Sequence, residues 1–343
     1  MPTVDAEPQA ANWMETYQSA DACISYSKWA GELLQKQSRE INYIGCAPPS
    51  ANSAYQIIAN KSGLREKYGI KPDAKIIGTV MRNQRRKLFP DLFSAFSKFL
   101  STVEKPEEYF LYCHTSFPDM GWDIPSLLQE HSISNNVLFT YVCSEYNKPY
   151  CSTFSGAQSK SPYSGKMTGN FSSVKAGLEY RDLSEIVNLF DLYIQYANSE
   201  GFGLPQVEAA ACGVPVMSVD YSAMSSVIRK LGGEPLKVKA LYKELETGCM
   251  RAVPDNDYTV EKIIEFFKLP EAMRKKKGFD CKQAFDKHFK WQDSGKVWEN
   301  AIDSLESKNA WISEPDIKQV PEMPQNINQW SVEEQATFLI LGV

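Results

Sequence analysis

The chain has 343 residues, and 37 Lys and Arg against 42 Asp and Glu give a formal net charge of −5. This balance excludes nucleic-acid binding through global positive charge. With 43% hydrophobic and 23% charged residues, the composition is that of a globular chain, long enough for one large or two medium domains. No window approaches the roughly 18 apolar residues of a membrane span, and the first residues lack the pattern of a signal peptide. We therefore expect a cytoplasmic protein with no transmembrane segment and no nucleic-acid partner.

The eight cysteines are spread widely, and several lie in apolar runs such as Ala210-Ala211-Cys212. That distribution predicts reduced, buried thiols and not a disulfide framework.

Short apolar segments alternate with segments of helical periodicity along the chain. The expected strands are residues 75–80, 109–113, 136–141, 192–196 and 214–218, and the expected helices are 92–100, 124–128, 183–190 and 206–212. Such alternation predicts an α/β fold with a doubly wound, mostly parallel, Rossmann-like sheet.

Two regions interrupt this pattern. Residues 151–173 are rich in Ser and Gly and too long for an ordinary connection, so we expect an insertion at about 143–175. After a helix at 291–305, prolines mark an extended linker, and Ser331-Val-Glu-Glu334 resembles a capping box that opens a terminal helix. Residues 306–343 would then form a C-terminal extension.

The most informative stretch follows the expected strand 192–196. Gly201 and Gly203 suit a tight turn, and Pro205 suits the first turn of the next helix. Backbone amides and the positive helix end would point at whatever lies beyond the strand, which is an anion-binding geometry. Glu200 precedes the glycine turn, and Glu208 lies one turn into the helix that follows it. Both can therefore face one cleft beside a phosphate site, where carboxylates suit sugar hydroxyls.

The combined string E-G-F-G-L-P-x-x-E-A-x-x-x-G-x-P-V, from Glu200 to Val216, resembles the retaining glycosyltransferases of the GT-B fold, family 4, also called group 1. A second match lies upstream, where residues 76–87 resemble the first strand and basic loop of the family's donor domain. By position, Arg82 and Lys87 would contact the donor diphosphate, Arg as a fork and Lys as a point charge. We expect Arg85 and Arg86 to form a solvated basic turn.

The resemblance implies transfer of a sugar from a UDP-, GDP- or ADP-sugar to an unknown acceptor, with the anomeric configuration retained and no metal or other cofactor required. The implied catalytic residues are Glu200, Arg82 and Lys87. Glu200 would support the sugar, and Glu208 would bind the ribose hydroxyls. The donor would also contact the amides of the turn at Gly201, Phe202, Gly203 and Leu204.

The same resemblance divides the chain into three parts. Residues 1–49 look like a remnant of an N-terminal acceptor domain, with a late strand at 1–8 and a hinge at 46–49. Residues 50–305 look like a nearly complete donor domain. The alternative is a noncatalytic nucleotide-sugar-binding or assembly half that needs a partner chain for its N-terminal half, and self-association is possible in either case. A sugar-nucleotide epimerase of similar fold fits less well, because its catalytic groups would come from the missing half.

Four further features have simpler explanations or stay open. Asp255-Asn256-Asp257 has the D-x-D form of metal-dependent glycosyltransferases, but its place before a helical pattern favours an N-cap. Cys143 and Cys151 are too few for a structural zinc site and are either unrelated to zinc or remnants of a ribbon. His114 follows a strand at its ligand-binding edge. Residues 222–226 depart from the family pattern, which puts donor-sugar contacts there in doubt.

Overall fold

The computed structural model describes residues 3–173 and 177–305. The chain divides into two units, Met1–Ser304 and Leu305–Val343, and the elements given below belong to the first. The linker, capping box and terminal helix expected within 306–343 lie outside the described residues. The expected boundaries of the three parts stay a prediction.

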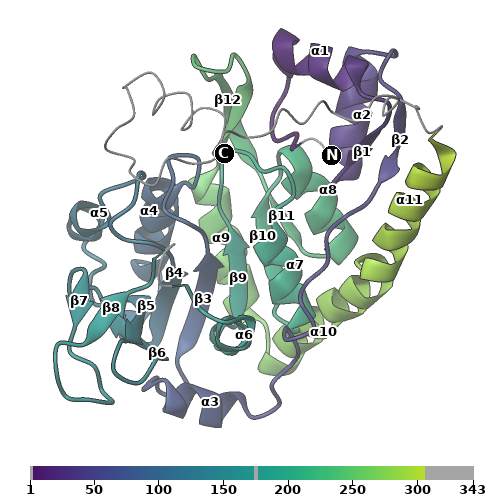
Figure 1. Cartoon of the computed structure of the whole chain (residues 1–343). Coiled ribbons are helices and arrows are strands. Elements are labelled where there is room, and N and C mark those ends of the chain that lie inside the picture. Colours follow the sequence, from purple (N-terminus) through teal and green to yellow (C-terminus); the bar gives the residue numbers. More distant parts are fainter. Residues whose placement is uncertain (1–2, 174–176, 306–343) are drawn as a thin grey trace, which may run out of the picture. The chain divides into compact units, whose positions relative to one another are not determined.

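A parallel sheet forms the middle of the first unit (Figure 1). Its parallel strands lie in the order β11–β10–β9–β3–β4–β5. Their bounds are β3 (Lys75–Val80), β4 (Tyr109–His114), β5 (Val137–Cys143), β9 (Leu192–Gln195), β10 (Val216–Val219) and β11 (Glu234–Leu236). The expected α/β class with a doubly wound, parallel-rich sheet is confirmed, because the chain runs outward from β3 and β9 in opposite directions.

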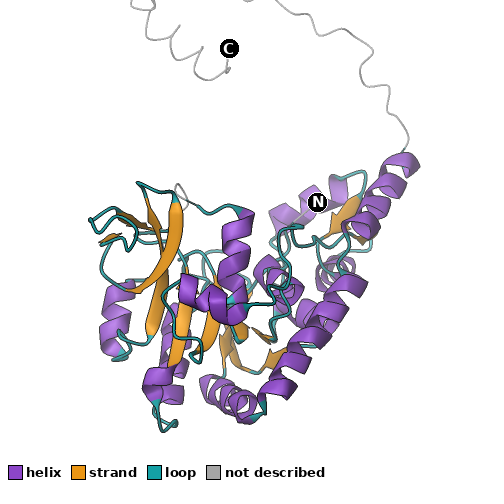
Figure 2. Cartoon of the chain, turned by 90° about the horizontal axis from the view of Figure 1, so that it is seen from below, coloured by secondary structure: helices purple, strands orange, loops and turns teal. Residues whose placement is uncertain are grey.

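Helices cover both faces of this sheet (Figure 2), because its strands are apolar on both sides. Neighbouring residues of β3 show the two faces: Ile77 packs in one core cluster and Ile76 in the other. The first face is covered by α4 (Phe89–Leu100), α5 (Ile124–Glu130) and α9 (Asn256–Lys268). The second is covered by α3 (Lys61–Lys67), α6 (Tyr180–Asn188), α7 (Leu204–Ala211), α8 (Ser222–Leu231) and α10 (Glu271–His288).

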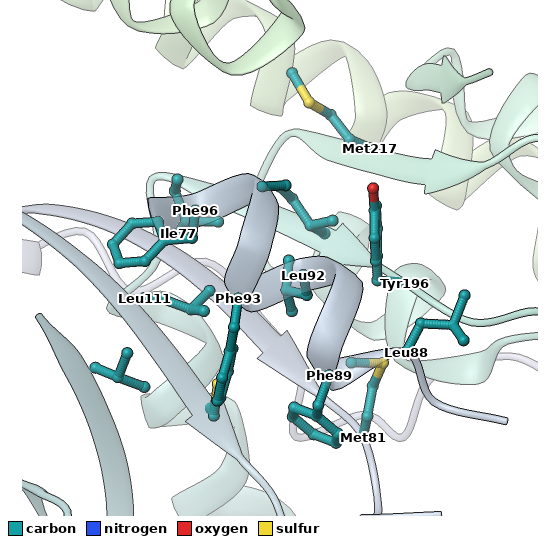
Figure 3. Packing of buried hydrophobic residues seen from close by; sticks show 14 of the residues in the cluster. Ile77, Met81, Leu88, Phe89, Leu92, Phe93, Phe96, Leu111, Tyr196 and Met217 are labelled. Atoms are coloured by element: carbon teal, nitrogen blue, oxygen red, sulfur yellow. The ribbon is translucent and has the colours of Figure 1, made fainter. Parts of the chain in front are cut away.

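Helix α4 shows how the first core is built (Figure 3). Phe89, Phe93 and Phe96 recur at helical spacing and are fully or almost fully buried. They lie over Ile77 and Leu111 of the sheet, so that α4 and the end of β3 are held rigidly together. The loop between them, residues 81–88, is therefore fixed at both ends.

The expected insertion is an ordered extension of the sheet. It contains β6 (Lys148–Thr153), β7 (Gln158–Ser159) and β8 (Gly169–Phe171), all in antiparallel pairs. Cys151 pairs in register with Thr140, three residues from Cys143 on β5. Since side chains alternate along a strand, the two thiols face opposite sides of the sheet and lie in or against different core clusters. They are therefore not two ligands of one zinc site.

Residues before the sheet form a small satellite. It contains α1 (Ala11–Ser19), β1 (Cys23–Ser25), α2 (Lys28–Gln37) and β2 (Tyr43–Cys46), and β1 and β2 form a two-stranded parallel sheet. The strand expected at 1–8 is wrong for the residues described there, since residues 3–10 form no strand. This segment instead packs along β13 (Met250–Pro254): Met250 N donates to Glu7 O at 2.7 Å, and proline at position 8 has no N–H for a ladder.

Three further elements complete the described chain. β12 (Val238–Lys243) and β13 form an antiparallel hairpin, and a 3₁₀ turn spans Pro106–Glu108. Helix α11 (Trp291–Ser304) follows α10 and runs toward β2, with which it makes contact (Figure 1). Among the described residues, no helix is both long and apolar enough to cross a membrane.

Candidate functional site

The candidate site lies where β3 and β9 are neighbours. From β3 the chain proceeds to β4 and β5 on one side, and from β9 to β10 and β11 on the other. In open parallel sheets, ligands bind outside the carboxyl ends of the strands at such a reversal. Here those ends lead into two loops, residues 81–88 after β3 and residues 196–203 after β9.

Main-chain hydrogen bonds join these two loops. Leu88 N donates to Tyr196 O at 3.1 Å, and Asn198 N donates to Arg86 O at 2.9 Å. Lys87 and Ala197 form a bridge between them. The backbone thus fixes two basic side chains of the first loop beside the start of the glycine turn.

The carboxylate of Glu200 collects three side-chain donors. Lys87 Nζ and Gln195 Nε2 donate to Oε1, the latter at 3.0 Å, and Arg86 Nη1 donates to Oε2 at 2.6 Å. The side chains of Lys87 and Glu200 are each 8% exposed, so this is a buried ion pair. Burial and the neighbouring Arg86 guanidinium lower the pKa of Lys87. Ser222 fixes the backbone, because its Oγ accepts from Glu200 N at 2.9 Å.

The glycine turn ends at the N-terminus of α7. Gly203 has φ +84° and ψ +55°, the left-handed region that glycine adopts without strain, and a Cβ there would lie 2.6 Å from Gln206 Nε2. Pro205 stands in the first turn, where its missing N–H is not needed by the helix. No side chain caps this helix end, so its amides and its positive dipole end are available to an anion.

A cavity of about 520 Å³ opens beside this helix end. One part of its wall is Arg86, Glu200 and the turn residues Gly201, Phe202, Gly203 and Leu204, and the rest is Thr3, Asp5, Tyr26 and Pro49. The structure thus brings five of the predicted site residues to one cavity: Glu200, Gly201, Phe202, Gly203 and Leu204. Asp5 was not expected there. It accepts from Arg251 Nη1 at 3.2 Å, and no motif in the sequence marks either residue.

The basic loop differs from expectation in one respect. Arg86 was expected to be solvated, and its side chain is 39% exposed, but its contacts were not expected: its backbone is tied to the β9 loop, and its side chain reaches Glu200 and lines the cavity. Arg82 instead pairs with Asp119, with Nε 2.9 Å from Oδ2, and its side chain is 44% exposed. Arg85 is exposed as expected and lies over the ring of Trp122 at 5.1 Å.

Glu208, unlike Glu200, lies outside the cavity wall. Its side chain is buried and is not part of the cavity wall. Burial raises its pKa to about 7, and the neighbouring Tyr55 hydroxyl partly offsets this effect. The two glutamates are equally buried but have different surroundings, because Glu200 lines the cavity and pairs with two cations, whereas Glu208 lies beside the Tyr55 hydroxyl.

The other candidate features have structural roles. Asp255 is the N-cap of α9, since its side chain accepts from Tyr258 N at 3.0 Å, so the capping prediction is confirmed. His114 Nδ1 lies 3.0 Å from Thr140 Oγ1, and burial lowers its pKa to about 4, which makes it neutral at pH 7. No cluster of three or more His, Cys, Asp or Glu in residues 3–173 and 177–305 is arranged to hold a metal ion.

Comparison with known proteins adds independent support for the fold. The family model described as "Glycosyl transferases group 1" matches residues 170–277, which include both glutamates and the glycine turn but not the basic loop. No curated protein sequence matches the chain.

Solved glycosyltransferase structures share the architecture at low sequence identity. Sucrose-phosphate synthase from Thermosynechococcus elongatus has a TM-score of 0.61 and 16% identity over 85% of this chain and 61% of its own. A glycosyltransferase from Rickettsia africae has a TM-score of 0.58 and 13% identity over 87% of this chain and 67% of its own. Anabaena HepE, in complex with UDP and glucose, has a TM-score of 0.58 and 14% identity over 84% of this chain and 65% of its own. This chain thus spans about two thirds or less of the length of these proteins. Its fold is that of GT-B glycosyltransferases.

Proposed function

We propose that this chain binds a nucleotide-diphosphate sugar and transfers the sugar to an acceptor with retention of configuration, as a family-4-like glycosyltransferase. One observation carries the proposal. At the switch point of the sheet, an uncapped helix N-terminus stands beside a buried carboxylate that is held by two cations. The group 1 match across this turn points the same way.

The arrangement suits cleavage of a sugar–phosphate bond. As that bond breaks, negative charge grows on the leaving diphosphate and positive charge on the sugar ring. Lys87, Arg86 and the amides at the start of α7 would stabilise the first. Glu200, which lines the same cavity, would stabilise the second electrostatically.

Donor binding must change the contacts of the two cations. In this structure both pair with Glu200, whose single negative charge balances only one of them, whereas a diphosphate brings at least two negative charges to the helix end. We propose that Lys87 and Arg86 turn toward the diphosphate, which frees one edge of Glu200 for the sugar. Because these cations supply the positive charge, the reaction we propose requires no metal.

Two further roles complete the proposal. Glu208 would bind the ribose hydroxyls after a small side-chain movement, as its lack of a strong ionic partner allows. Arg82 would leave Asp119 for the diphosphate, which its exposure permits. The donor is a UDP-, GDP- or ADP-sugar.

The alternative is a nucleotide-sugar-binding half that takes its acceptor domain from a partner chain. In the described residues 3–49, the satellite's two-stranded parallel sheet is much smaller than the sheet of a Rossmann-like domain. The two functions differ in turnover. The transferase alone moves the sugar to an acceptor and releases the nucleoside diphosphate, whereas the half-domain alone binds the nucleotide and turns over only with its partner.

Titration calorimetry with UDP, GDP and ADP tests the proposal. We expect one of them to bind the wild type, and Lys87→Ala to weaken that binding at least tenfold. Arg85→Ala is the matched control, because it removes the same charge from the same loop without contacting Glu200. If none of the three nucleotides binds, or if the two variants behave alike, the proposal fails.

A further inference from the structure

Two buried polar side chains lie in the central strand β9, where the fold calls for apolar ones. Tyr193 and Gln195 are both 0% exposed, and their neighbours on the strand are Leu192 and Ile194. Burying an amide or a hydroxyl is unfavourable unless its hydrogen bonds are made. The contacts of these two side chains therefore show what they do.

The contacts form a chain that ends on Glu200. Tyr193 Oη donates to Gln195 Oε1 at 2.5 Å, and Gln195 Nε2 donates to Glu200 Oε1 at 3.0 Å. The tyrosine hydroxyl fixes the amide, because a donor on Oε1 leaves the NH₂ group facing the carboxylate. Burial, and secondarily the nearby Glu208 carboxylate, raise the pKa of the Tyr193 phenol.

Gln195 differs from the other two donors to Glu200 in its charge. Lys87 and Arg86 are cations, and a diphosphate competes with Glu200 for both. The amide of Gln195 is neutral and fully enclosed, so a diphosphate neither attracts nor reaches it. When the cations move to the nucleotide sugar, the Gln195 amide is the hydrogen-bond donor that remains on the Glu200 carboxylate.

We propose that Gln195, oriented by Tyr193, is a positioning residue that holds Glu200 against the donor sugar while Lys87 and Arg86 engage the diphosphate. This inference rests on the function proposed above. It assigns Gln195 no contact with the substrate, and its effect appears only when the ligand carries a sugar.

The test compares two affinities for each protein. Calorimetry measures UDP and UDP-glucose, GDP and GDP-mannose, and ADP and ADP-glucose, and the pair that binds the wild type is kept. For Gln195→Leu we expect the affinity for the nucleotide sugar to fall about tenfold relative to that for the diphosphate, since a hydrogen bond to a charged group is lost. The diphosphate affinity stays within about twofold.

A matched control comes from the neighbouring strand. Ser218 lies opposite Gln195 in the β9–β10 register, is fully buried, and its hydroxyl has no hydrogen-bond partner. Ser218→Ala should leave unchanged the ratio of the affinity for the nucleotide sugar to the affinity for the diphosphate. Tyr193→Phe should lower that ratio by less than Gln195→Leu, and it supplies the test if Gln195→Leu does not fold.

A second readout separates hydrogen bonding from packing. Gln195→Glu keeps the shape but donates to Glu200 only when the two carboxyls share a proton. Its ratio should approach that of the wild type at pH 5.5 and fall toward that of Gln195→Leu at pH 8.5. If the wild type binds no nucleotide, the proposed function fails. If it binds, two results overturn the positioning role. In the first, Gln195→Leu and Gln195→Glu both keep the wild-type ratio of nucleotide-sugar affinity to diphosphate affinity. In the second, both variants lower this ratio equally at the two pH values.

Discussion

Replacing Lys87 by Met should lower the stability of the protein by about 3 kcal/mol. Removing one partner of a buried ion pair typically costs about 3–5 kcal/mol, because the other charge is left buried. Lys87 and Glu200 are each only 8% exposed, so this range applies. Arg86 and Gln195 still donate to Glu200 in the variant, which places the expected loss at the lower end.

Urea denaturation of the wild type and three variants measures this loss. The double variant Lys87→Met/Glu200→Gln removes both charges and should recover most of it, since no unpaired carboxylate remains. Arg85→Met deletes an exposed cation from the same loop and should change the free energy of unfolding by less than about 0.5 kcal/mol. A loss below about 1 kcal/mol for Lys87→Met, or a double variant less stable than the single one, would refute the buried pair.

Three further outcomes are expected. Arg82→Ala removes the cationic partner of Asp119, whose side chain is only 5% exposed, and should cost about 1–3 kcal/mol of stability, while Ser116 and the Met120 amide still donate to that carboxylate. It should also weaken calorimetric binding of the nucleotide; unchanged binding would refute its predicted contact with the diphosphate. Glu208 has a folded-state pKa of about 7, above its ordinary value near 4.5, so the wild type should lose up to about 3 kcal/mol of stability as the pH rises from 4.5 to 8. In urea titrations Glu208→Gln should lack this loss. If the free energy of unfolding falls equally with pH in both proteins, the assignment is contradicted. Gly78→Ala would place a Cβ 2.1 Å from the Phe190 ring, so thermal unfolding should show a loss of about 1–3 kcal/mol; an unchanged melting temperature would count against this packing.

Local patterns predicted the elements of the sheet well. The apolar runs and helical spacings between residues 75 and 218 predicted strands β3, β4, β5, β9 and β10 and helices α4 to α7, because these elements have strong periodicity; β6, β7 and β8 of the insertion were not predicted. The turn from Glu200 to Leu204 could also be predicted, since its glycines, proline and helix start are contiguous in the sequence.

Contacts across the sheet could not be predicted in the same way. Lys87 and Glu200 are 113 residues apart, and they meet because β3 and β9 are neighbours, which no local pattern specifies. For the same reason Arg86 resembled an ordinary solvated arginine. Gln195 carried a weak signal, as a polar residue in an apolar strand, but its partner becomes evident only in three dimensions.

The N-terminal segment shows a different limit. The family resemblance suggested a strand at 1–8, but residues 3–10 form no strand and instead lie along β13 and the cavity. Tertiary packing decides the conformation of such a short segment, whose intrinsic preference is weak. Asp5 consequently enters the cavity wall without any motif that announces it.

A crystal structure with the bound nucleoside diphosphate tests the central claim most directly. The account predicts that the diphosphate lies at the start of α7, within hydrogen-bond distance of the amides of Gly203 or Leu204, with Lys87 Nζ on a phosphate oxygen and no longer on Glu200. Gln195 stays on Glu200. A second cavity, of about 460 Å³, lies between residues 51–57 and α10. A nucleotide bound there, or one that leaves the Lys87–Glu200 pair intact, would contradict the account.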